Sequence, residues 1–520
     1  MSKLIVRLLL CCVFILATSI NGQSYHEKYR LQLHFSMPSG WANDPNGLIY
    51  SDEYYHLFYQ HDPSGALNKL LHWGHARSRD LIHWENLPVA LYPYEKGDIF
   101  SGCCVIDKDN VTGLISAENQ DQSNNTIVAV YTLHKDIEQS QALAYSFDDG
   151  ITWTQYDANP VLPNPGIPDF RDPNIFERDG RFYMALAVLD RISFYTSSNL
   201  LEWTRLGDFG LEPNEGDKSG VWECPSVVRL KDEQNNEHDI LIVSENGDTR
   251  GSLTQYFVGT FNGTHFNSYD QSKILWVDNG FDNYAAIPYQ NDPSGRVLII
   301  GWMSNWLYAQ YTPTTTWRGQ MTIPRELALQ TIDGNIHLVQ RPIDELMNLV
   351  DATRKWSLST PLTLSGNQIV DLTPQIPFKT GSMFTLEYVF NIENVVNGKV
   401  GLRFSNFFGE FITFFFDLSE GIYYLDRSNS GDVSFSPRFA NRMADAKRIR
   451  STNSLSGQVI LDTASIEIFA DDGLNTFSAI FFPSELFENI QLLCAIEDNE
   501  KPITVEKLSV AALHSIWAES

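Results

Sequence analysis

The chain has 520 residues, of which 43% are apolar and 19% are charged. This composition supplies large hydrophobic cores and argues against extensive disorder. There are 37 Lys and Arg residues against 64 Asp and Glu, so the net charge is −27, which disfavours nucleic acids and anionic membrane surfaces as partners. The length favours three or four domains, although two large all-β domains also fit.

The N-terminus has the features of a secretory signal peptide, which we predict at residues 1–22. Lys3 and Arg7 accompany the apolar run Leu8–Ala17, and small residues follow it. The alternative is a membrane anchor, but the run is shorter than the roughly 20 apolar residues of a spanning helix. We therefore expect a secreted, extracellular protein that is not attached to a membrane once the signal peptide has been removed. Three glycosylation sequons fit this expectation, at Asn110, Asn124 and Asn262.

Cysteine and histidine spacing predicts neither a disulfide scaffold nor a metal site. Outside the signal the cysteines are Cys103, Cys104, Cys224 and Cys494, and none forms a C-x-x-C pair. His72 and His75 lie three residues apart, but strand-like flanks and the lack of a third ligand favour sheet or pocket positions over zinc binding. We expect activity without a metal or another cofactor.

From about residue 30 to 340, short strand-like runs alternate with turn residues. One pattern recurs at residues 78–84, 146–153 and 197–203: a strand end, a polar turn, and a Trp that opens the next strand. The Trp spacings of 69 and 50 residues are of the order of one propeller blade. We predict a five-bladed β-propeller over residues 30–340, with a pair of β-sandwiches as the alternative.

The remaining chain predicts a second all-β domain. Pro342–Val350 has the pattern of a short helix with proline in its first turn, within a linker that we place at residues 341–359. Longer strands follow, such as Phe384–Phe390, and we predict a structural β-sandwich over residues 360–520. Its acids Asp471 and Asp472 are expected in a solvated turn.

Three acidic residues stand among turn-forming and aromatic neighbours. Asp44 lies in the turn-rich segment 41–47, directly before a proline. Asp172 stands between Arg171 and another proline, and Glu223 has Trp and Cys as neighbours, where we expect an apolar setting. Glycoside hydrolysis requires a nucleophile, a stabilising carboxylate and a general acid. A propeller would bring three such separated acids together at its central funnel.

These segments resemble glycoside hydrolase family 32, the invertases and other β-fructofuranosidases. The resemblance runs from about His34 to the C-terminal end, and its motifs occur in the family's order. The matching segments are Trp41–Gly47, Phe58–Gln60, His72–His75, Phe100–Gly102, Phe170–Pro173, Trp222–Pro225, Ser304–Trp306 and Asp426–Ser428. The family's fold is a five-bladed propeller followed by a β-sandwich, in agreement with the strand pattern.

The resemblance implies a role for each acid and a set of sugar-binding residues. Asp44 would be the nucleophile, Glu223 the acid/base, and Asp172, beside Arg171, would hold ring hydroxyls. The positions implied for sugar binding are Trp41, Asn43, Gln60, Trp73, Phe100, Ser101, Arg171 and Trp306. A neutral sugar is held by hydrogen bonds and aromatic walls rather than by net charge. Core packing is the alternative for Trp73 and Trp306.

The leading hypothesis is a secreted retaining β-fructofuranosidase that hydrolyses chiefly sucrose to glucose and fructose. An exo-inulinase or levanase acting on fructans shares the same fructose subsite, and a fructan-forming transferase would differ in its acceptor. A non-catalytic sugar-binding propeller would require the loss of a carboxylate, and all three are present. Ala42 and the pair Cys103–Cys104 depart from the family pattern, and we expect both departures at the pocket wall.

Overall fold

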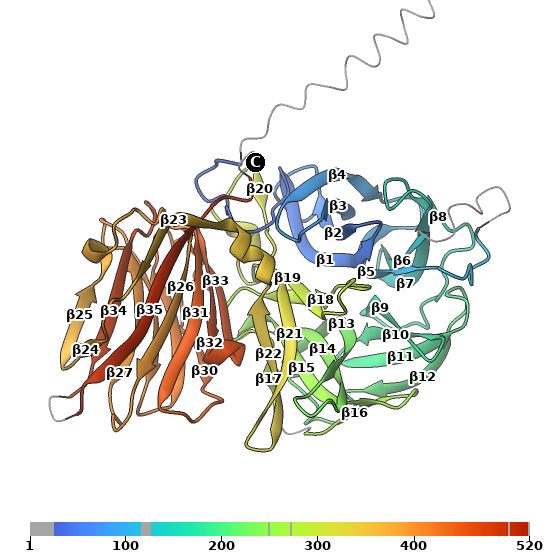
Figure 1. Cartoon of the computed structure of the whole chain (residues 1–520). Helices are drawn as coiled ribbons and strands as arrows, with labels where there is room; N and C mark the ends of the chain where they lie inside the picture. Colours follow the sequence, from blue (N-terminus) through green and yellow to red (C-terminus); the bar gives the residue numbers. More distant parts are fainter. Residues whose placement is uncertain (1–24, 116–125, 248–249, 271–272, 498–499, 518–520) are drawn as a thin grey trace, which may run out of the picture.

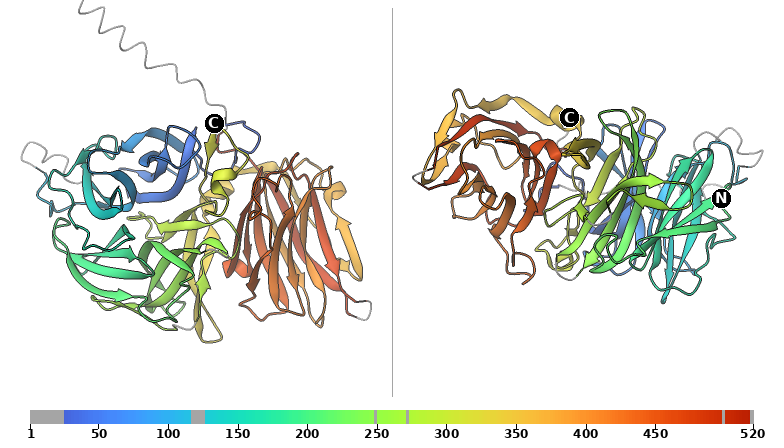
Figure 2. Two further views of the ribbon diagram at one scale, coloured as in Figure 1. Left: turned by 180° about the vertical axis from the view of Figure 1, so that it is seen from behind. Right: turned by 90° about the horizontal axis from the view of Figure 1, so that it is seen from below.

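The computed structural model describes residues 25–115, 126–247, 250–270, 273–497 and 500–517. The predicted signal peptide and the Asn124 sequon therefore lie outside the described residues. Five sheets surround a common centre, and two further sheets pack face to face beside them (Figures 1 and 2). The fold is the predicted five-bladed β-propeller followed by a β-sandwich, whereas the exact domain boundaries stay a prediction.

Each propeller blade is an antiparallel sheet whose first strand lies nearest the axis. The strands of the first two blades are β1 (Gly40–Ser51), β2 (Tyr54–Asp62), β3 (His72–Ser78), β4 (Trp84–Leu91), then β5 (Asp98–Ile106), β6 (Ile127–Lys135), β7 (Glu138–Ser146) and β8 (Thr154–Gln155). Those of the third are β9 (Phe170–Arg178), β10 (Arg181–Val188), β11 (Arg191–Ser197) and β12 (Thr204–Phe209). β1 is buried along nearly its whole length, whereas β12 is largely solvent-accessible.

The last two blades complete the ring. Their strands are β13 (Gly220–Lys231), β14 (Glu237–Gly247), β15 (Gly251–Phe261), β16 (Phe266–Ser268) and β17 (Leu275–Trp276), then β18 (Tyr284–Pro288), β19 (Leu298–Trp302), β21 (Arg325–Ile332) and β22 (Asn335–Pro342). A 3₁₀ helix, η2 (Ala309–Tyr311), precedes β20 (Trp317–Arg318). β20 pairs in parallel with β1, which joins the last blade to the first and closes the propeller.

The recurring sequence pattern is a structural repeat. In each of the first three blades it forms the turn between the third and fourth strands. A side-chain oxygen of Asp80, Asp148 or Asn199 accepts backbone N–H groups of that turn at 2.8–3.1 Å. The polar residue therefore fixes the turn, and the following Trp starts the outer strand.

The sandwich begins with η3 (Asp344–Leu349), a 3₁₀ helix where the sequence predicts a short helix. One sheet contains β23 (Val350–Ser357), β24 (Leu362–Leu364), β26 (Phe384–Asn391), β31 (Ser454–Asp462), β32 (Ser465–Ala470), β33 (Asn475–Ile480) and β35 (Ile503–Leu513). The other contains β25 (Asn367–Asp371), β27 (Lys399–Ser405), β28 (Phe411–Asp417), β29 (Ile422–Asn429), β30 (Ala444–Lys447) and β34 (Asn489–Ala495). Two short 3₁₀ helices are η4 (Thr373–Gln375) and η5 (Asp471–Gly473). β23 falls within the range predicted as a linker and pairs with β35.

The turn after β32 differs from the expectation in one residue. Asp472 is accessible, but Asp471 is fully buried, because left-handed backbone angles at both residues fold the turn back onto the sandwich. The Asp471 carboxylate accepts hydrogen bonds from Tyr423 Oη at 2.9 Å and Arg448 Nε at 2.7 Å. The prediction of a solvated Asp471 is therefore wrong.

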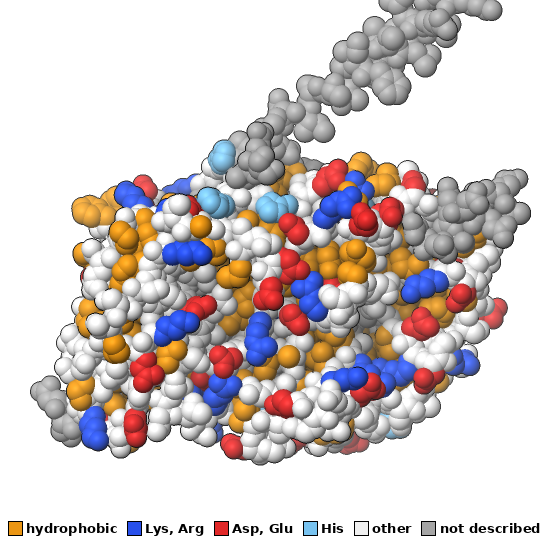
Figure 3. Space-filling view, viewed as in Figure 1, with side chains coloured by type: hydrophobic (Ala, Val, Ile, Leu, Met, Phe, Trp, Pro, Cys, Tyr) orange, Lys and Arg blue, Asp and Glu red, His pale blue; other side chains and the backbone are white. Residues whose placement is uncertain are grey.

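Acidic and basic side chains are interspersed on the face shown in Figure 3. Within the described ranges, no helix is both long and apolar enough to span a bilayer.

Buried ion pairs join the propeller to the sandwich. Arg325 of β21 binds Glu467 of β32 and Asp278, with Nη1 2.9 Å from the Asp278 carboxylate. Arg427 of β29 contacts Asp282 at 2.7 Å in the same way. All five side chains are almost completely buried, so the charges must compensate each other.

His34 extends this network to the start of the propeller. Its Nδ1 lies 2.8 Å from Asp462 and its Nε2 lies 2.9 Å from Glu467. Burial alone would lower the pKa of His34, but these two carboxylates raise it to about 9. Against the effect of burial, Arg325 and His34 lower the pKa of Glu467 to about 2. The imidazolium therefore holds two buried carboxylates together.

The raised pKa of His34 predicts a pH-dependent stability. Protonated His34 contributes to stability fully below its unfolded-state pKa of 6.5, and the contribution disappears as pH rises through about 9. His34→Gln should therefore lower the free energy of unfolding by about 3 kcal/mol at pH 6, with a smaller deficit at pH 9. Urea unfolding monitored by tryptophan fluorescence measures this difference.

The matched control is His83→Gln, which removes an exposed histidine bound to Asp80 at 2.7 Å. An exposed pair contributes little, so this variant should unfold like the parent at both pH values. If His34→Gln and His83→Gln behaved alike, His34 would not join the two domains electrostatically.

Candidate active site

The innermost strands of all five blades depart from regular pairing at the same level. The register shifts lie at residues 42–45 in β1, 99–102 in β5, 171–174 in β9, 223–226 in β13 and 284–287 in β18. Such bulges redirect side chains out of the sheet plane. Figure 1 shows these five strands around the centre, and residues from all five line one narrow cavity.

Prolines and left-handed residues produce three of these irregularities. Pro45, Pro173 and Pro225 lack the N–H that a regular ladder needs, and prolines within sheets are confined to edges and bulges. Asp172 and Cys224, directly before two of them, have φ values of 62° and 45°. Positive φ is costly for residues other than glycine and occurs often at functional sites.

The structure brings the three predicted acids together on this axis. A narrow cavity is lined by all five inner strands, through Asn46, Ser101, Asp172, Cys224 and Ile287 among others. Asp172 comes from β9, Asp44 from β1 and Glu223 from β13. The predicted convergence of three separated motifs is therefore a property of the fold.

Asp44 is held by a relay of hydrogen bonds. Asn43 Nδ2 donates to Asp44 Oδ1 at 2.9 Å, and Ser101 Oγ donates to Oδ2 at 2.8 Å. Trp41 Nε1 in turn donates to Asn43 Oδ1 at 2.7 Å and fixes that amide. Burial and the nearby Glu223 raise the pKa of Asp44, whereas these donors favour its ionised form. The carboxylate is thus both oriented and confined.

Glu223 sits in a polar setting rather than the apolar one expected from its sequence neighbours. Arg171 Nη2 donates to Glu223 Oε1 at 2.8 Å, and the Tyr284 hydroxyl donates to Oε2. Trp222 instead packs into the core between the third and fourth blades. The reason is strand alternation, which turns neighbouring side chains to opposite faces of β13.

Arg171 binds across blades rather than to its sequence neighbour. Its nearest contact with Asp172 is 4.0 Å, longer than its bond to Glu223, and a further bond goes to Asp169. Asp172 Oδ2 accepts the Cys224 backbone N–H at 3.0 Å. The Cys224 thiol also lies 3.4 Å from Asp44 and 3.6 Å from Asp172, between the two carboxyls.

The three carboxyls influence one another electrostatically. Burial raises the pKa of Asp172 to about 7; Arg171 opposes this rise, and Glu223 and Asp44 add to it. One proton therefore stays within the cluster below neutral pH. A site that holds a proton beside an ionised carboxylate can perform acid and nucleophilic chemistry at once.

Aromatic side chains cluster beside the site, with Trp41 and Trp302 fully buried and Trp306 partly exposed. The Trp41 and Trp306 rings stack with centroids 5.7 Å apart, and Trp302 lies 4.7 Å from Trp306. Phe100 is partly exposed and stacks on His134 at 4.5 Å. Trp306 and Phe100 thus occupy positions from which a sugar ring could be contacted.

Gln60 and Trp73 lie deeper. With the Asn46 amide in the orientation that satisfies its neighbours, Asn46 Oδ1 accepts from Gln60 N and Nε2 at 3.0 Å each. Gln60 Oε1 has no partner among the described residues and remains an available acceptor. Trp73 is fully buried in the core of the first two blades and donates to the Phe100 carbonyl at 3.0 Å. It supports Phe100 from behind.

The unusual residues lie in the core instead of the pocket wall. Cys103 accepts the Ile175 N–H at 3.2 Å, and Cys104 packs under Gly47. Ala42 is buried among the hydrophobic residues of the first and last blades. All four cysteines of the described part are free and buried. The expectation that these positions shape the pocket surface is wrong.

Sequence reasoning missed Tyr284, whose hydroxyl holds Glu223. It lies in β18, whose five residues are all buried. Their sequence pattern indicates only a short core strand. No local pattern marks it, because its partner stands 61 residues earlier in the chain. Trp302, which is fully buried and packs against Trp41 and Trp306, was missed for the same reason.

The family-model comparison assigns both halves of the chain to one glycoside hydrolase family. The N-terminal domain model of glycosyl hydrolases family 32 matches residues 34–342, and the C-terminal model matches residues 345–512. The convergent carboxyls and this match define a glycoside hydrolase. The chain belongs to glycoside hydrolase family 32.

Relatives include enzymes named for fructans and for sucrose. A levanase of Bacillus subtilis is 36% identical, covering 99% of this chain and 76% of the levanase. An extracellular exo-inulinase of Aspergillus awamori is 36% identical over 91% of this chain and 93% of that protein, and its crystal structure gives a TM-score of 0.84 at 33% identity, covering 95% of this chain and all of that one. Invertase 2 of Saccharomyces cerevisiae is 33% identical over 85% of this chain and 87% of the invertase.

The shared proton predicts the basic limb of the pH profile. We expect kcat/KM to fall as pH rises through about 7, because the carboxyl cluster then loses the proton that it retains at lower pH and that the departing group requires. Arg171 holds the pKa of Asp172 down, so Arg171→Met should move this limb to higher pH while lowering activity. Initial rates from pH 4 to 9 measure the shift.

Arg178→Met is the matched control. Arg178 lies on the same strand but pairs with Asp239 at 2.9 Å, outside the cluster. Its pH profile should follow that of the parent. If the basic limb of the Arg171→Met profile stayed in place or moved to lower pH, Arg171 would not be the group that lowers the pKa of Asp172.

Proposed function

We propose that this chain is an exo-acting, retaining β-fructofuranosidase that removes terminal β-D-fructofuranosyl residues. The observation that carries the proposal is the position of Asp44, oriented by three donors beside a second carboxyl that is held separately by Arg171 and Tyr284. Two carboxyls in different environments are what glycoside hydrolysis requires, and hydrolysis is retaining when one of them attacks the anomeric carbon.

In the first step, Asp44 attacks the anomeric carbon of the fructosyl unit. The bond from that carbon to the leaving oxygen breaks, and Glu223 gives this oxygen a proton, so that an alcohol departs. A fructosyl ester on Asp44 remains. Asp172 accepts hydrogen bonds from ring hydroxyls, which strengthen as positive charge develops on the ring.

In the second step, Glu223 takes a proton from water. The resulting nucleophile attacks the anomeric carbon, the ester bond to Asp44 breaks, and fructose leaves with its original anomeric configuration. Arg171 and Tyr284 keep both Glu223 oxygens in place through the two steps. The site thereby returns to its initial protonation state.

Sucrose and fructans present the same terminal fructosyl unit and differ only in the leaving group. Sucrose hydrolysis to glucose and fructose follows from the fructose subsite alone. Fructan hydrolysis is supported by a specific observation: the levanase and exo-inulinase match this chain over 99% and 91% of its length, against 85% for the invertase. We propose that the enzyme accepts both and that fructans are the preferred class.

Secretion is part of the same proposal. The apolar N-terminal run and the name of the extracellular exo-inulinase relative support it. Asn262 lies exposed in a turn between β15 and β16. Asn110 is partly buried whereas Asn262 is exposed, so Asn262 is the better acceptor.

A substrate panel tests the substrate assignment. Sucrose, inulin and levan are incubated with the enzyme, and released glucose and fructose are quantified separately. We expect single fructose units from all three and the higher kcat/KM on a fructan. Oligosaccharide products would contradict exo action, and kcat/KM values much higher on sucrose would contradict the fructan preference.

Two carboxyl variants test the roles. Asp44→Asn should lose activity on every substrate by at least about 10⁴-fold, because even a good leaving group cannot compensate for the loss of the nucleophile. Glu223→Gln should lose most activity on sucrose but keep rapid first turnover on a fructoside with an acidic aryl leaving group, which needs no protonation. Added azide should then restore turnover. Equal losses in both variants on both substrates would contradict the assignment.

A further inference from the structure

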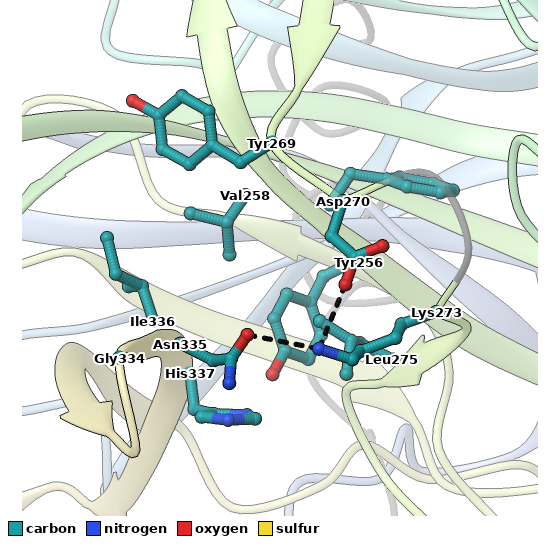
Figure 4. Close-up of a pocket in the computed structure, with 11 residues that line it drawn as sticks. Tyr256, Val258, Tyr269, Asp270, Lys273, Leu275, Gly334, Asn335, Ile336 and His337 are labelled. Atoms are coloured by element: carbon teal, nitrogen blue, oxygen red, sulfur yellow. Dashed lines mark hydrogen bonds and ion pairs between the residues drawn. The ribbon is translucent and has the colours of Figure 1, made fainter.

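A second cavity lies between the fourth and fifth blades, away from the axis. It is formed by residues of β15, β17 and β22 together with Tyr269, Asp270 and Lys273, none of which lies on an inner strand. Its volume is about 290 Å³, at the lower end of the range for small-molecule sites. Figure 4 shows its side chains facing a common space.

One side of the cavity offers a fixed aromatic face. The Tyr269 side chain is 53% exposed, yet its hydroxyl lies 3.1 Å from His238 Nδ1 and its backbone N–H donates to Val258 at 2.9 Å. Val258 and Ile336 extend this apolar wall. An exposed ring that is already held in place loses little entropy on binding.

The opposite side offers hydrogen-bonding groups. Lys273 Nζ donates to Asn335 Oδ1 at 3.0 Å and lies 2.9 Å from Asp270, so its charge is matched locally (Figure 4). His337 Nδ1 is buried without a hydrogen-bond partner among the described residues. Burial and Lys273 lower the pKa of His337, so the imidazole is neutral and has one donor and one acceptor nitrogen.

These groups select a ligand class. An anion would have to displace Asp270 from Lys273, and the protein's charge of −27 disfavours its approach. A purely apolar ligand would leave His337 Nδ1 without a hydrogen-bond partner. A sugar ring has an apolar face for Tyr269 and hydroxyls that both donate and accept.

We propose that this cavity is an ancillary carbohydrate site that binds one or two neutral sugar units of the fructan substrate. The identity of the sugar rests on the proposed fructan activity, whereas the aromatic face and the polar wall stand on the geometry alone. A polymer engaged here and at the axis is held at two points, which raises its effective concentration at the catalytic cluster.

The test measures fructan binding in an inactive background. Asp44→Asn is compared with Asp44→Asn/Tyr269→Ala by electrophoresis in native gels containing long-chain inulin or levan. We expect the removal of Tyr269 to raise the apparent Kd about fivefold, the size of one lost aromatic contact. Asp44→Asn/Phe407→Ala is the matched control, since Phe407 is a 94% exposed aromatic residue outside the cavity.

Activity measurements separate this inference from the proposed function. Tyr269→Ala in the active enzyme should keep the parent kcat/KM on sucrose and show a raised KM on the polymer. Failure of the untouched enzyme to release fructose from inulin and levan would contradict the fructan proposal, while retardation that depends on Tyr269 would still support the site.

Three results would overturn the ancillary site. They are unchanged retardation on removal of Tyr269, an equal loss on removal of Phe407, and no retardation of Asp44→Asn in either gel. His337→Ala is a second test in the same binding measurement, because it removes the unpartnered nitrogen and leaves the aromatic face unchanged. It should weaken binding in the same direction as Tyr269→Ala.

Discussion

The interruption of regular pairing in the five innermost strands is the constraint on which the site depends. A regular ladder would turn the Asp44, Asp172 and Glu223 side chains alternately into the cores between blades. The register shifts release these strands at one level and aim their polar groups at the axis. The cost is lost hydrogen bonds and left-handed backbone at Asp172 and Cys224, which the surrounding blades must offset.

Charge compensation follows from that convergence. Three carboxyls in one buried space repel one another, and Arg171, on the same strand as Asp172, contacts Glu223 at 2.8 Å and Asp172 at 4.0 Å. The same rule operates at the domain junction, where Arg325 and Arg427 neutralise buried acids between the propeller and the sandwich. Loss of one partner from such a pair would leave an uncompensated buried charge. The sandwich thus fixes the last blade, which carries Tyr284.

The sequence predicted what local chemistry determines. The three acids stand next to prolines or aromatic residues, and the polar turns repeat at blade spacing, so the acids and the propeller were both predictable. Contacts between blades were not predictable from the sequence. The partner of Arg171 is Glu223 rather than Asp172, and Tyr284 meets Glu223 only because the ring of blades closes. Cys103 and Cys104 follow a site motif but face the cores, since a strand alternates its side chains.

The central claim is that Asp44 forms a covalent bond to the fructosyl unit. The most direct measurement is mass spectrometry of Glu223→Gln after brief reaction with an activated aryl fructoside, followed by acid quench and peptide mapping. We expect a mass increase of one fructosyl unit on the peptide that contains Asp44. The double variant Asp44→Asn/Glu223→Gln should show no such increase. An unmodified Asp44 peptide during steady turnover, or a label on Asp172, would contradict it.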